Sequence, residues 1–435
     1  MTRAQLLGPV LLLALLPSNV VSAAMPLLLK EWQAPNADGG IVFAAYQVGY
    51  VLSVLLVLPL TDRAGAGRVI TACALITALS FILFPLLAVN VLTASLLRLC
   101  AGLGLAGIYL PGVRIIAASA TSQRRGLAVG TYVAAFYLGS AASLWATGAL
   151  LPTYGWRGAA LALALASVLA VPLALIATRG MWSTGSPARS SAGSLKSGER
   201  PASPAGPKDA PANDKSPAVS KVATSGASAS GRLDLGALRD GAVARNVLAY
   251  TGHSWELYVS RGWLAAFVAS VLVARGSDAL SASAAGSQWA ALMAGFGTPG
   301  VLLGGWLSDH FGRSRTALLI TLLSGALSLV FGFLGAGPWA LLLAAGCLYG
   351  LLISADSAIY STAITELAAP GRLGSAQAVQ AFFGFSATIV APIAAGKALD
   401  LGWGWGVIFV LAGSVGLALG APLLWDIAVA HRSQR

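Results

Sequence analysis

The chain has 435 residues, of which 57% are hydrophobic and only 10% are charged. Soluble domains carry roughly a quarter of charged residues, so this sequence has too few polar side chains to cover a water-soluble globule of its length. The composition excludes that class and predicts a polytopic membrane protein. The net charge of +12 would also suit a nucleic-acid-binding protein, and the positions of the basic residues decide between the two classes.

Apolar segments of about 20 residues, long enough to cross a bilayer as helices, recur along the chain. Their Leu, Ala and Gly content favours helices over barrel strands, which would be about ten residues long and would alternate polar with apolar side chains. The sequence predicts an all-α polytopic membrane protein with twelve transmembrane helices. They lie near residues 5–29, 39–60, 69–90, 91–113, 126–151, 158–178, 246–272, 284–308, 316–336, 338–364, 373–397 and 404–426.

The first of these segments has features of a signal peptide. A basic residue, Arg3, precedes an apolar core and an Ala-rich end, as in secretory leaders. The apolar run nevertheless continues to Leu29, which makes it long enough to span a bilayer. We therefore expect it to remain in the protein as the first transmembrane helix.

Lys and Arg concentrate in alternate connections between the spans. If the N-terminus is cytoplasmic, the loops on the opposite side hold only Lys30, Arg157, Arg275 and Lys397. This asymmetry is typical of helical membrane proteins. It predicts a multi-pass protein of the cytoplasmic (inner) membrane with both termini cytoplasmic, and it argues against a nucleic-acid partner.

Three landmarks occur twice at a nearly constant offset, which indicates an internal duplication. They are Asp62 and Asp309, 247 residues apart, Gly155 and Gly402, also 247 apart, and Gly126 and Gly374, 248 apart. Each copy holds six predicted spans. The sequence therefore predicts two six-helix pseudo-repeats, an N-terminal bundle over residues 1–180 and a C-terminal bundle over residues 244–435.

The segment between the copies, residues 181–243, is dominated by Ser, Ala, Pro, Gly and Lys. Such a composition buries too little apolar surface to offset the entropy of ordering the chain. We expect a disordered cytoplasmic linker. Its basic residues could bind anionic lipid headgroups, but acidic residues interrupt them, which favours a passive tether.

A charged turn follows the second span of each copy, in LPLTDRAGAGR and GGWLSDHFGRSR. The glycines permit tight or left-handed backbone there, and the Asp carboxylates suit a helix N-terminus or an arginine. A contact of this kind is easily broken when that face opens to water, so the turns are predicted gating loops; the alternative is a topological stop with solvated charges. The residues concerned are Asp62, Arg63, Gly65 and Arg68, and Gly305, Asp309, Gly312 and Arg313.

These motifs resemble those of the major facilitator superfamily. GWLSDHFGR matches the family's loop motif Gly-x-Leu-x-Asp-x-x-Gly-Arg closely, whereas LPLTDRAGAGR departs from it at Leu58 and Ala66. RLCAGLG, which begins at Arg98, fits the family's fourth-helix pattern Arg-x-x-x-Gly-x-Gly. The resemblance implies the superfamily fold, secondary transport by alternating access and a gating role for the loops.

Away from their ends, the predicted spans contain few ionisable side chains: Arg98, His253, Glu256, Arg261 and Asp356. Such groups cost about 2.5–3.5 kcal/mol each on insertion scales, so they are candidates for function by default. His253 and Glu256 share one face of span 7, which we expect to line an aqueous cavity rather than only to fix packing. Glu256 and Asp356 should lie at a similar depth in the membrane.

Two carboxylates in a low-dielectric site tend to retain a proton, and the imidazole of His253 titrates in the physiological range. The group is a predicted proton-coupling site. The alternative is a permanent ion pair of Glu256 or Asp356 with Arg261. Arg98 and Arg261, in opposite halves, would suit an anionic solute, or Arg98 could respond to the protonation of the coupling site.

The sequence therefore predicts a secondary active transporter that moves a small organic solute, preferably an organic anion, coupled to protons. One alternative is a proton-antiport efflux pump for drugs or metabolites; span 5 has Gly130 and Gly139 but lacks the proline common in such relatives. A second alternative is a non-transporting sensor or scaffold. No His-x-x-x-His, Cys pair or phosphate loop occurs, so we expect no enzyme, cofactor or metal site. We expect a monomer in the lipid bilayer.

Overall fold

The computed structural model describes residues 3–121, 125–181, 235–369 and 372–432, which are almost entirely helical and contain no strand. The N-terminal elements are η1 (Arg3–Leu6), α1 (Leu7–Leu15), α2 (Val20–Trp32), α3 (Asn36–Leu56), α4 (Leu58–Ala64), α5 (Ala66–Leu87), α6 (Val91–Ser119), α7 (Arg125–Val168) and α8 (Ala170–Ala177). The C-terminal elements are η3 (Leu235–Arg239), α9 (Gly241–Ala274), α10 (Ala279–Gly295), α11 (Gly297–Phe311), α12 (Arg313–Phe331), η4 (Gly332–Ala336), α13 (Trp339–Ala355), α14 (Ser357–Leu367), α15 (Leu373–Asp400), α16 (Trp405–Gly420) and α17 (Leu423–Arg432).

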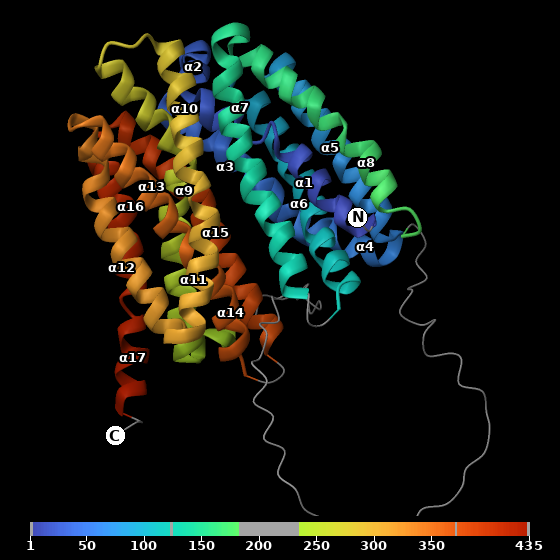
Figure 1. Cartoon of the computed structure of the whole chain (residues 1–435), viewed down its shortest axis with the longest axis vertical. Coiled ribbons are helices and arrows are strands. Elements are labelled where there is room, and N and C mark those ends of the chain that lie inside the picture. Colours follow the sequence, from blue (N-terminus) through green and yellow to red (C-terminus); the bar gives the residue numbers. More distant parts are fainter. Residues whose placement is uncertain (1–2, 122–124, 182–234, 370–371, 433–435) are drawn as a thin grey trace, which may run out of the picture.

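By length and hydropathy, the described residues contain 11 helices that could cross a membrane. One of them, Ala128–Ala177, has 50 residues. At 1.5 Å per residue it would be about 75 Å long if straight, more than twice the ~30 Å hydrocarbon core of a bilayer. It folds back at Gly155, where φ is 62° and ψ is −178°, and Figure 1 shows α7 rising and the chain descending again to α8. Two crossings therefore replace one, which confirms the prediction of twelve transmembrane helices.

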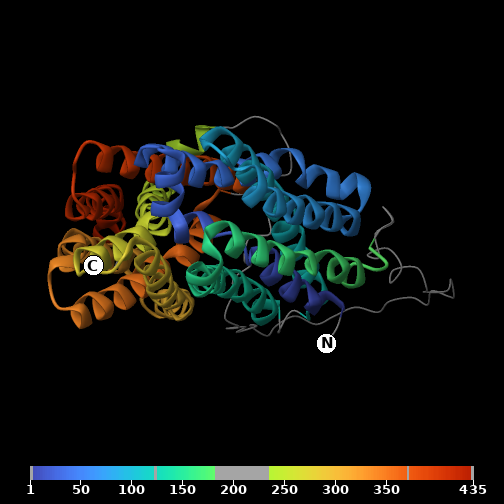
Figure 2. The ribbon, with the colours of Figure 1, turned by 90° about the horizontal axis from the view of Figure 1, so that it is seen from above.

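The helices form two bundles that lie side by side, α1–α8 in one and α9–α17 in the other (Figures 1 and 2). The predicted linker lies outside the described residues from 182 to 234. Its last part was predicted to be disordered, but residues 235–239 form η3 and residues 241–243 begin α9. The Asp240 carboxylate caps α9 by accepting from the backbone N–H of Ala242 at 2.9 Å and of Val243 at 3.4 Å, a strong helix-start signal.

The backbone repeats at the offset found in the sequence. Gly65 (φ 84°, ψ 134°) and Gly312 (φ 87°, ψ 152°) end α4 and α11 in the same conformation. Gly155 and Gly402 also share a positive φ, of 62° and 81°. A side chain would strain the backbone at these positions, so the duplicated glycines mark duplicated turns.

Close helix packing repeats as well. A Cβ on Gly102 of α6 would lie 2.0 Å from the Tyr46 carbonyl oxygen of α3, and one on Gly350 of α13 would lie 1.9 Å from the Met293 carbonyl oxygen of α10. Only glycine allows backbones this close, as is common between membrane helices. The second and fourth spans of each half are thus packed in the same way.

The two halves touch mainly at one end of the molecule. We call the end that carries Gly65 and Gly312 the inner end, and the end that carries Gly155 and Gly402 the outer end. Near the outer end α3 crosses α15 and α7 crosses α10, where the Ser287 hydroxyl donates to the Leu144 carbonyl at 2.6 Å. Toward the inner end the halves diverge (Figure 1).

The carboxylate of Asp400, the last residue of α15, joins the halves at the outer end. It accepts from the backbone N–H groups of Asn36 at 2.7 Å and Ala37 at 2.8 Å, and from the Asn36 side-chain amide at 2.9 Å. Asn36 and Ala37 begin α3, whose first N–H groups have no partner within the helix. A residue of one half therefore caps a helix of the other.

Candidate functional site

A small cavity lies between the halves, with a volume of about 50 Å³. An apolar cavity of about 150 Å³ is known to hold benzene, so this one must widen before it can take a ring-sized solute. Asn19, which directly precedes α2, and residues from α7 form one wall, and residues from α9, α10 and α13 form the other. They are Asn19, Tyr137, Ser140, Ala141 and Leu144 on one side, and Leu257, Ser260, Arg261, Leu264, Ala265, Ala290, Ala294, Tyr349, Gly350, Ile353 and Ser354 on the other.

Arg261 is the cation of this cavity. Leu257, Ser260, Arg261 and Leu264 all line it, because the spacing i, i+3, i+4, i+7 places them on one face of α9. The guanidinium carbon lies 5.6 Å from the ring centre of Tyr137 and 5.5 Å from that of Tyr258. These aromatic faces stabilise its charge.

Among the described residues Arg261 forms no ion pair. The alternative hypothesis of a permanent pair with Glu256 or Asp356 is therefore wrong, because both carboxylates have other partners. A guanidinium within the membrane with no anion beside it can bind an anionic solute through two parallel hydrogen bonds.

His253 and Asp356 come together inside the C-terminal half. The His253 Nδ1 lies 2.7 Å from the Asp356 Oδ1, and both side chains are 4% exposed. The His253 Nε2 lies 3.0 Å from the Ser357 hydroxyl. Asp356 and Ser357 are consecutive residues at the point where span 10 is interrupted, between α13 and α14. The contact with the carboxylate orients the imidazole.

Glu256 lies one helical turn further along α9 and is only 2% exposed. Its Oε2 accepts from the Ser324 hydroxyl at 3.3 Å, whereas its Oε1 has no hydrogen-bond partner among the described residues. It lies close enough to Asp356 for the two carboxylates to interact electrostatically. Tyr349 interacts with Glu256 and also lines the cavity. The predicted proton site is thus separated from the cavity by one tyrosine rather than exposed in it.

The structure places Arg98 elsewhere. Its side chain, on α6, is 3% exposed and does not line the cavity. Its Nη1 donates to the Ser18 carbonyl at 2.6 Å, and its guanidinium carbon lies 4.4 Å from the ring centre of Tyr46. Arg98 and Arg261 therefore do not meet around one space, although sequence considerations treat them alike.

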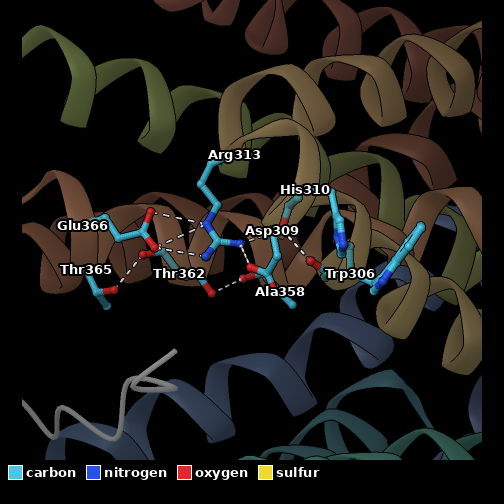
Figure 3. Close-up of polar contacts among 10 residues, drawn as sticks. Trp306, Asp309, His310, Arg313, Ala358, Thr362, Thr365 and Glu366 are labelled. Atoms are coloured by element: carbon cyan, nitrogen blue, oxygen red, sulfur yellow. Dashed lines mark hydrogen bonds and ion pairs between the residues drawn. The ribbon is translucent and has the colours of Figure 1, made fainter. Parts of the chain in front are cut away.

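The inner-end turn of the C-terminal half is held by Arg313. The Arg313 Nη1 donates to the Asp309 carboxylate at 2.5 Å and to the Ser308 hydroxyl at 2.7 Å, and its Nη2 donates to Glu366 at 3.1 Å (Figure 3). All of these contacts lie within one half. The sequence did not indicate Glu366, since it lies 53 residues from Arg313 and belongs to no local motif.

The equivalent turn of the N-terminal half lies between α4 and α5. Arg63 and Arg68 are exposed, and Gly65 forms the bend. The side chain of Asp62 lies outside what the structure describes. Gly305 lies on α11, where its carbonyl accepts from the Ser308 hydroxyl at 2.8 Å. In the described ranges no group of three or more His, Cys, Asp or Glu side chains could hold a metal ion.

Curated relatives match part of the chain. Over 152 residues this chain is 32% identical to the 4-hydroxybenzoate transporter PcaK of Pseudomonas putida. The matched segment covers 35% of this chain and 33% of that protein. The same transporter of Pseudomonas aeruginosa is 33% identical over 150 residues, with 33% of each chain covered. The chain spans about a third of the length of the curated relatives it matches.

Solved structures share the fold over almost the whole chain. The nucleoside transporter NupG superposes with a TM-score of 0.72 at 15% sequence identity. The match covers 97% of this chain and 98% of the NupG chain. A bacterial homologue of the human lysosomal transporter Spinster, in an inward-facing and unoccupied conformation, gives a TM-score of 0.65 at 16% identity, with 98% and 95% covered. The family model of the Major Facilitator Superfamily matches residues 7–276 and 257–435. With twelve transmembrane helices in two repeated halves, the chain belongs to the Major Facilitator Superfamily.

Proposed function

We propose that this protein carries a small organic anion across the cytoplasmic membrane by alternating access, coupled to the movement of protons. The observation that carries the proposal is Arg261, a cation without an ion pair among the described residues, in a cavity whose walls come from both halves. A carboxylate would give this guanidinium the anionic partner that it lacks among the described residues. Tyr137, which also lines the cavity, offers a ring face to an aromatic or apolar body.

The relatives agree with an anionic solute. The two curated proteins are named as transporters of 4-hydroxybenzoate, an aromatic carboxylate. We propose the same chemical class for this chain, because an arginine flanked by tyrosines suits a carboxylate on a ring. The matched segment covers only a third of those proteins. The proposal of an anionic solute therefore rests mainly on the position of Arg261 in the cavity.

Proton coupling is supported by the buried cluster of His253, Glu256 and Asp356. Two carboxylates and one imidazole lie together, shielded from water, with Tyr349 between Glu256 and the cavity. A proton bound to one of these carboxylates removes a charge from the low-dielectric interior, which changes the relative stability of the two access states. The proposed proton site and Arg261 would thus both belong to the C-terminal half.

The halves are arranged as an inward-facing carrier would be. They diverge at the inner end, where Leu55 and Leu56 of α3 are 65% and 61% exposed, and they are joined at the outer end by Asp400. We propose that these contacts exchange during transport: the outer contacts break as the inner ends close, and the inner-end turns then meet the other half.

Solute counterflow tests the solute class without assuming a driving force. Proteoliposomes are loaded with an unlabelled candidate and diluted into trace labelled 4-hydroxybenzoate. We expect transient accumulation of label with internal 4-hydroxybenzoate and other aromatic carboxylates, and none with their uncharged amides. Counterflow with the amides but not with the acids would reject an anion carrier.

Asp309→Asn is expected to slow exchange by roughly fivefold while leaving the amount of inserted protein unchanged. The exposed pair with Arg313 is worth at most about 1 kcal/mol, and its charge is required when the inner end closes. Initial counterflow rates at equal protein density measure the effect. His310→Gln, one residue away and bonded to its own helix at Trp306, is the control; equal rates for Asp309→Asn and wild type would reject a gating role.

Asp400→Ala is expected to open the outer end about fivefold more often, since losing a helix cap costs roughly 1 kcal/mol. A membrane-impermeant thiol reagent added from outside should react faster with Ser260→Cys, which lies in the cavity wall. Asp278→Ala is the matched control, because Asp278 caps its own helix by accepting from Leu280 and Ser281 at 3.0 Å. Equal acceleration by both variants would mean that helix fraying, rather than the contact between halves, controls access.

A further inference from the structure

The first transmembrane span is broken halfway. α1 ends at Leu15 and α2 begins at Val20, with Pro17 between them. Proline has no backbone N–H and cannot continue the hydrogen-bond ladder. Non-helical backbone at this depth is tolerated only where its polar groups find partners or line a cavity. The break at residues 16–19 meets both conditions.

The break is held from two neighbouring helices. From α7, the Ser143 hydroxyl accepts from the Asn19 backbone N–H at 2.9 Å. The Asn19 side-chain amide nitrogen donates to the Ser140 hydroxyl at 2.8 Å and to the Ser140 carbonyl at 3.1 Å. From α6, Arg98 donates to the Ser18 carbonyl at 2.6 Å. The backbone and side chain of Asn19 are thus fixed in one orientation.

Arg98 has no carboxylate partner among the described residues. Keeping a cation in the membrane costs about 2.5–3.5 kcal/mol on insertion scales, so its retention needs a reason. Its contacts are the Ser18 carbonyl and the Tyr46 ring. The bond to Ser18 lies next to the residue that reaches the cavity.

Asn19 lines the same cavity as Arg261. Its amide nitrogen is engaged by Ser140, which leaves the Oδ1 oxygen as its remaining hydrogen-bonding group, an acceptor. Ser140 lies one turn of α7 beyond Tyr137, whose ring centre is 5.6 Å from the Arg261 guanidinium. The Arg261 guanidinium and the Asn19 Oδ1 are therefore separated by roughly the Tyr137 ring and the one helical turn from Tyr137 to Ser140.

We propose that Asn19 contacts the solute and accepts a hydrogen bond from it, and that Arg98 is a positioning residue that holds Asn19 through the Ser18 carbonyl. This rests on the proposed function and deepens it. The solute would be a hydroxylated organic acid, with its carboxylate at Arg261 and its hydroxyl at Asn19. A cavity built to pair a hydroxyl discriminates strongly against the analogue that lacks it.

The test compares 4-hydroxybenzoate with benzoate in counterflow, for the wild type, Asn19→Ala, Arg98→Lys and the double variant. Asn19→Ala should raise the KM for 4-hydroxybenzoate about tenfold and leave the KM for benzoate within about twofold. Arg98→Lys keeps the charge but loses the fixed guanidinium geometry, so it should shift the same ratio in the same direction. The KM of the double variant for 4-hydroxybenzoate should be no higher than that of Asn19→Ala, because both changes remove the same interaction.

Other outcomes overturn the proposal. If Arg98→Lys raises both KM values equally and adds to Asn19→Ala, Arg98 binds the anion itself. If the variants lower only Vmax with an unchanged KM ratio, the break has a purely structural role. Ser140→Ala removes the hydroxyl acceptor of the Asn19 amide, leaves the Ser140 carbonyl in place and changes no charge, so it provides the same comparison if Arg98 variants fail to insert. Exchange of neither acid by the wild type would instead reject the proposed function, and this inference with it.

Discussion

Replacing Arg261 with alanine is expected to lower Vmax/KM for an organic anion by at least about 30-fold. Truncating one partner of a buried, hydrogen-bonded charge pair costs roughly 2–5 kcal/mol, much of it because the other charge is left unpaired. The solute carboxylate would be that unpaired charge. Counterflow of 4-hydroxybenzoate at several concentrations, at matched protein density, separates the change in KM from the change in Vmax.

A second substitution at the same position is expected to give an intermediate defect. Arg261→Lys keeps a positive charge but gives up the planar fork, so its defect should lie between those of the wild type and Arg261→Ala. Arg275→Ala is the matched control, because Arg275 lies just beyond the outer end of α9 and donates to the carbonyls of Gly335 and Gly337. Unchanged transport by Arg261→Ala, or an equal loss with Arg275→Ala, would remove Arg261 from the solute site.

The second large effect is expected at the buried carboxylates. Glu256→Gln and Asp356→Asn should each abolish accumulation driven by an imposed pH gradient, while counterflow at equal pH persists. An amide has the shape of the protonated acid but cannot bind or release a proton, so the carrier can still exchange solute but cannot gain energy from the gradient. Uptake into proteoliposomes with an alkaline interior, with and without a protonophore, measures this directly.

Glu366→Gln serves as the control for that prediction. Glu366 is an exposed carboxylate that pairs with Arg313 at the inner end, outside the buried cluster, and its loss should leave gradient-driven accumulation in place. If Glu256→Gln and Asp356→Asn both keep the full protonophore-sensitive accumulation, the coupling site lies elsewhere and the cluster only stabilises the C-terminal half.

Much of the fold could be predicted from the sequence because the bilayer imposes it. Every span must satisfy its backbone internally and present apolar side chains over a fixed thickness. The duplicated glycines could be recognised in the sequence, and their positive φ values in the structure identify them as turn residues. The offset of 247 residues between Gly65 and Gly312 was therefore sufficient to locate the same turn twice.

The partners of the polar residues could not be predicted in the same way. Asp356 pairs with His253, Arg313 with Glu366, and Asp400 with the start of α3. These partners come from helices far apart in the chain, and which helices meet depends on packing that no local pattern encodes. For Glu256 and Asp356, the sequence predicted only a similar depth in the membrane.

Arg98 and Arg261 show the limit most clearly. As letters in apolar spans they are equivalent candidates for anion binding. In the structure one contacts a backbone carbonyl inside the N-terminal half and the other lines the cavity between the halves. The one sequence signal that could have separated them is Pro17, which breaks the first span and leaves carbonyls in need of a donor.

Paired spin-label distances at both ends test the central claim, that the halves tilt around one solute site. In a background without Cys73, Cys100 and Cys347, one sample carries Leu55→Cys with Phe382→Cys at the inner end. A second sample carries Val89→Cys with Leu401→Cys at the outer end; all four positions are exposed.

Saturating solute at acidic pH should shift the inner distance to shorter values and the outer distance to longer values, in equal fractions of the molecules. Alternating access requires this opposite and matched change. Distances that stay fixed at both ends, or that lengthen together, would contradict a carrier whose two halves open one face as they close the other.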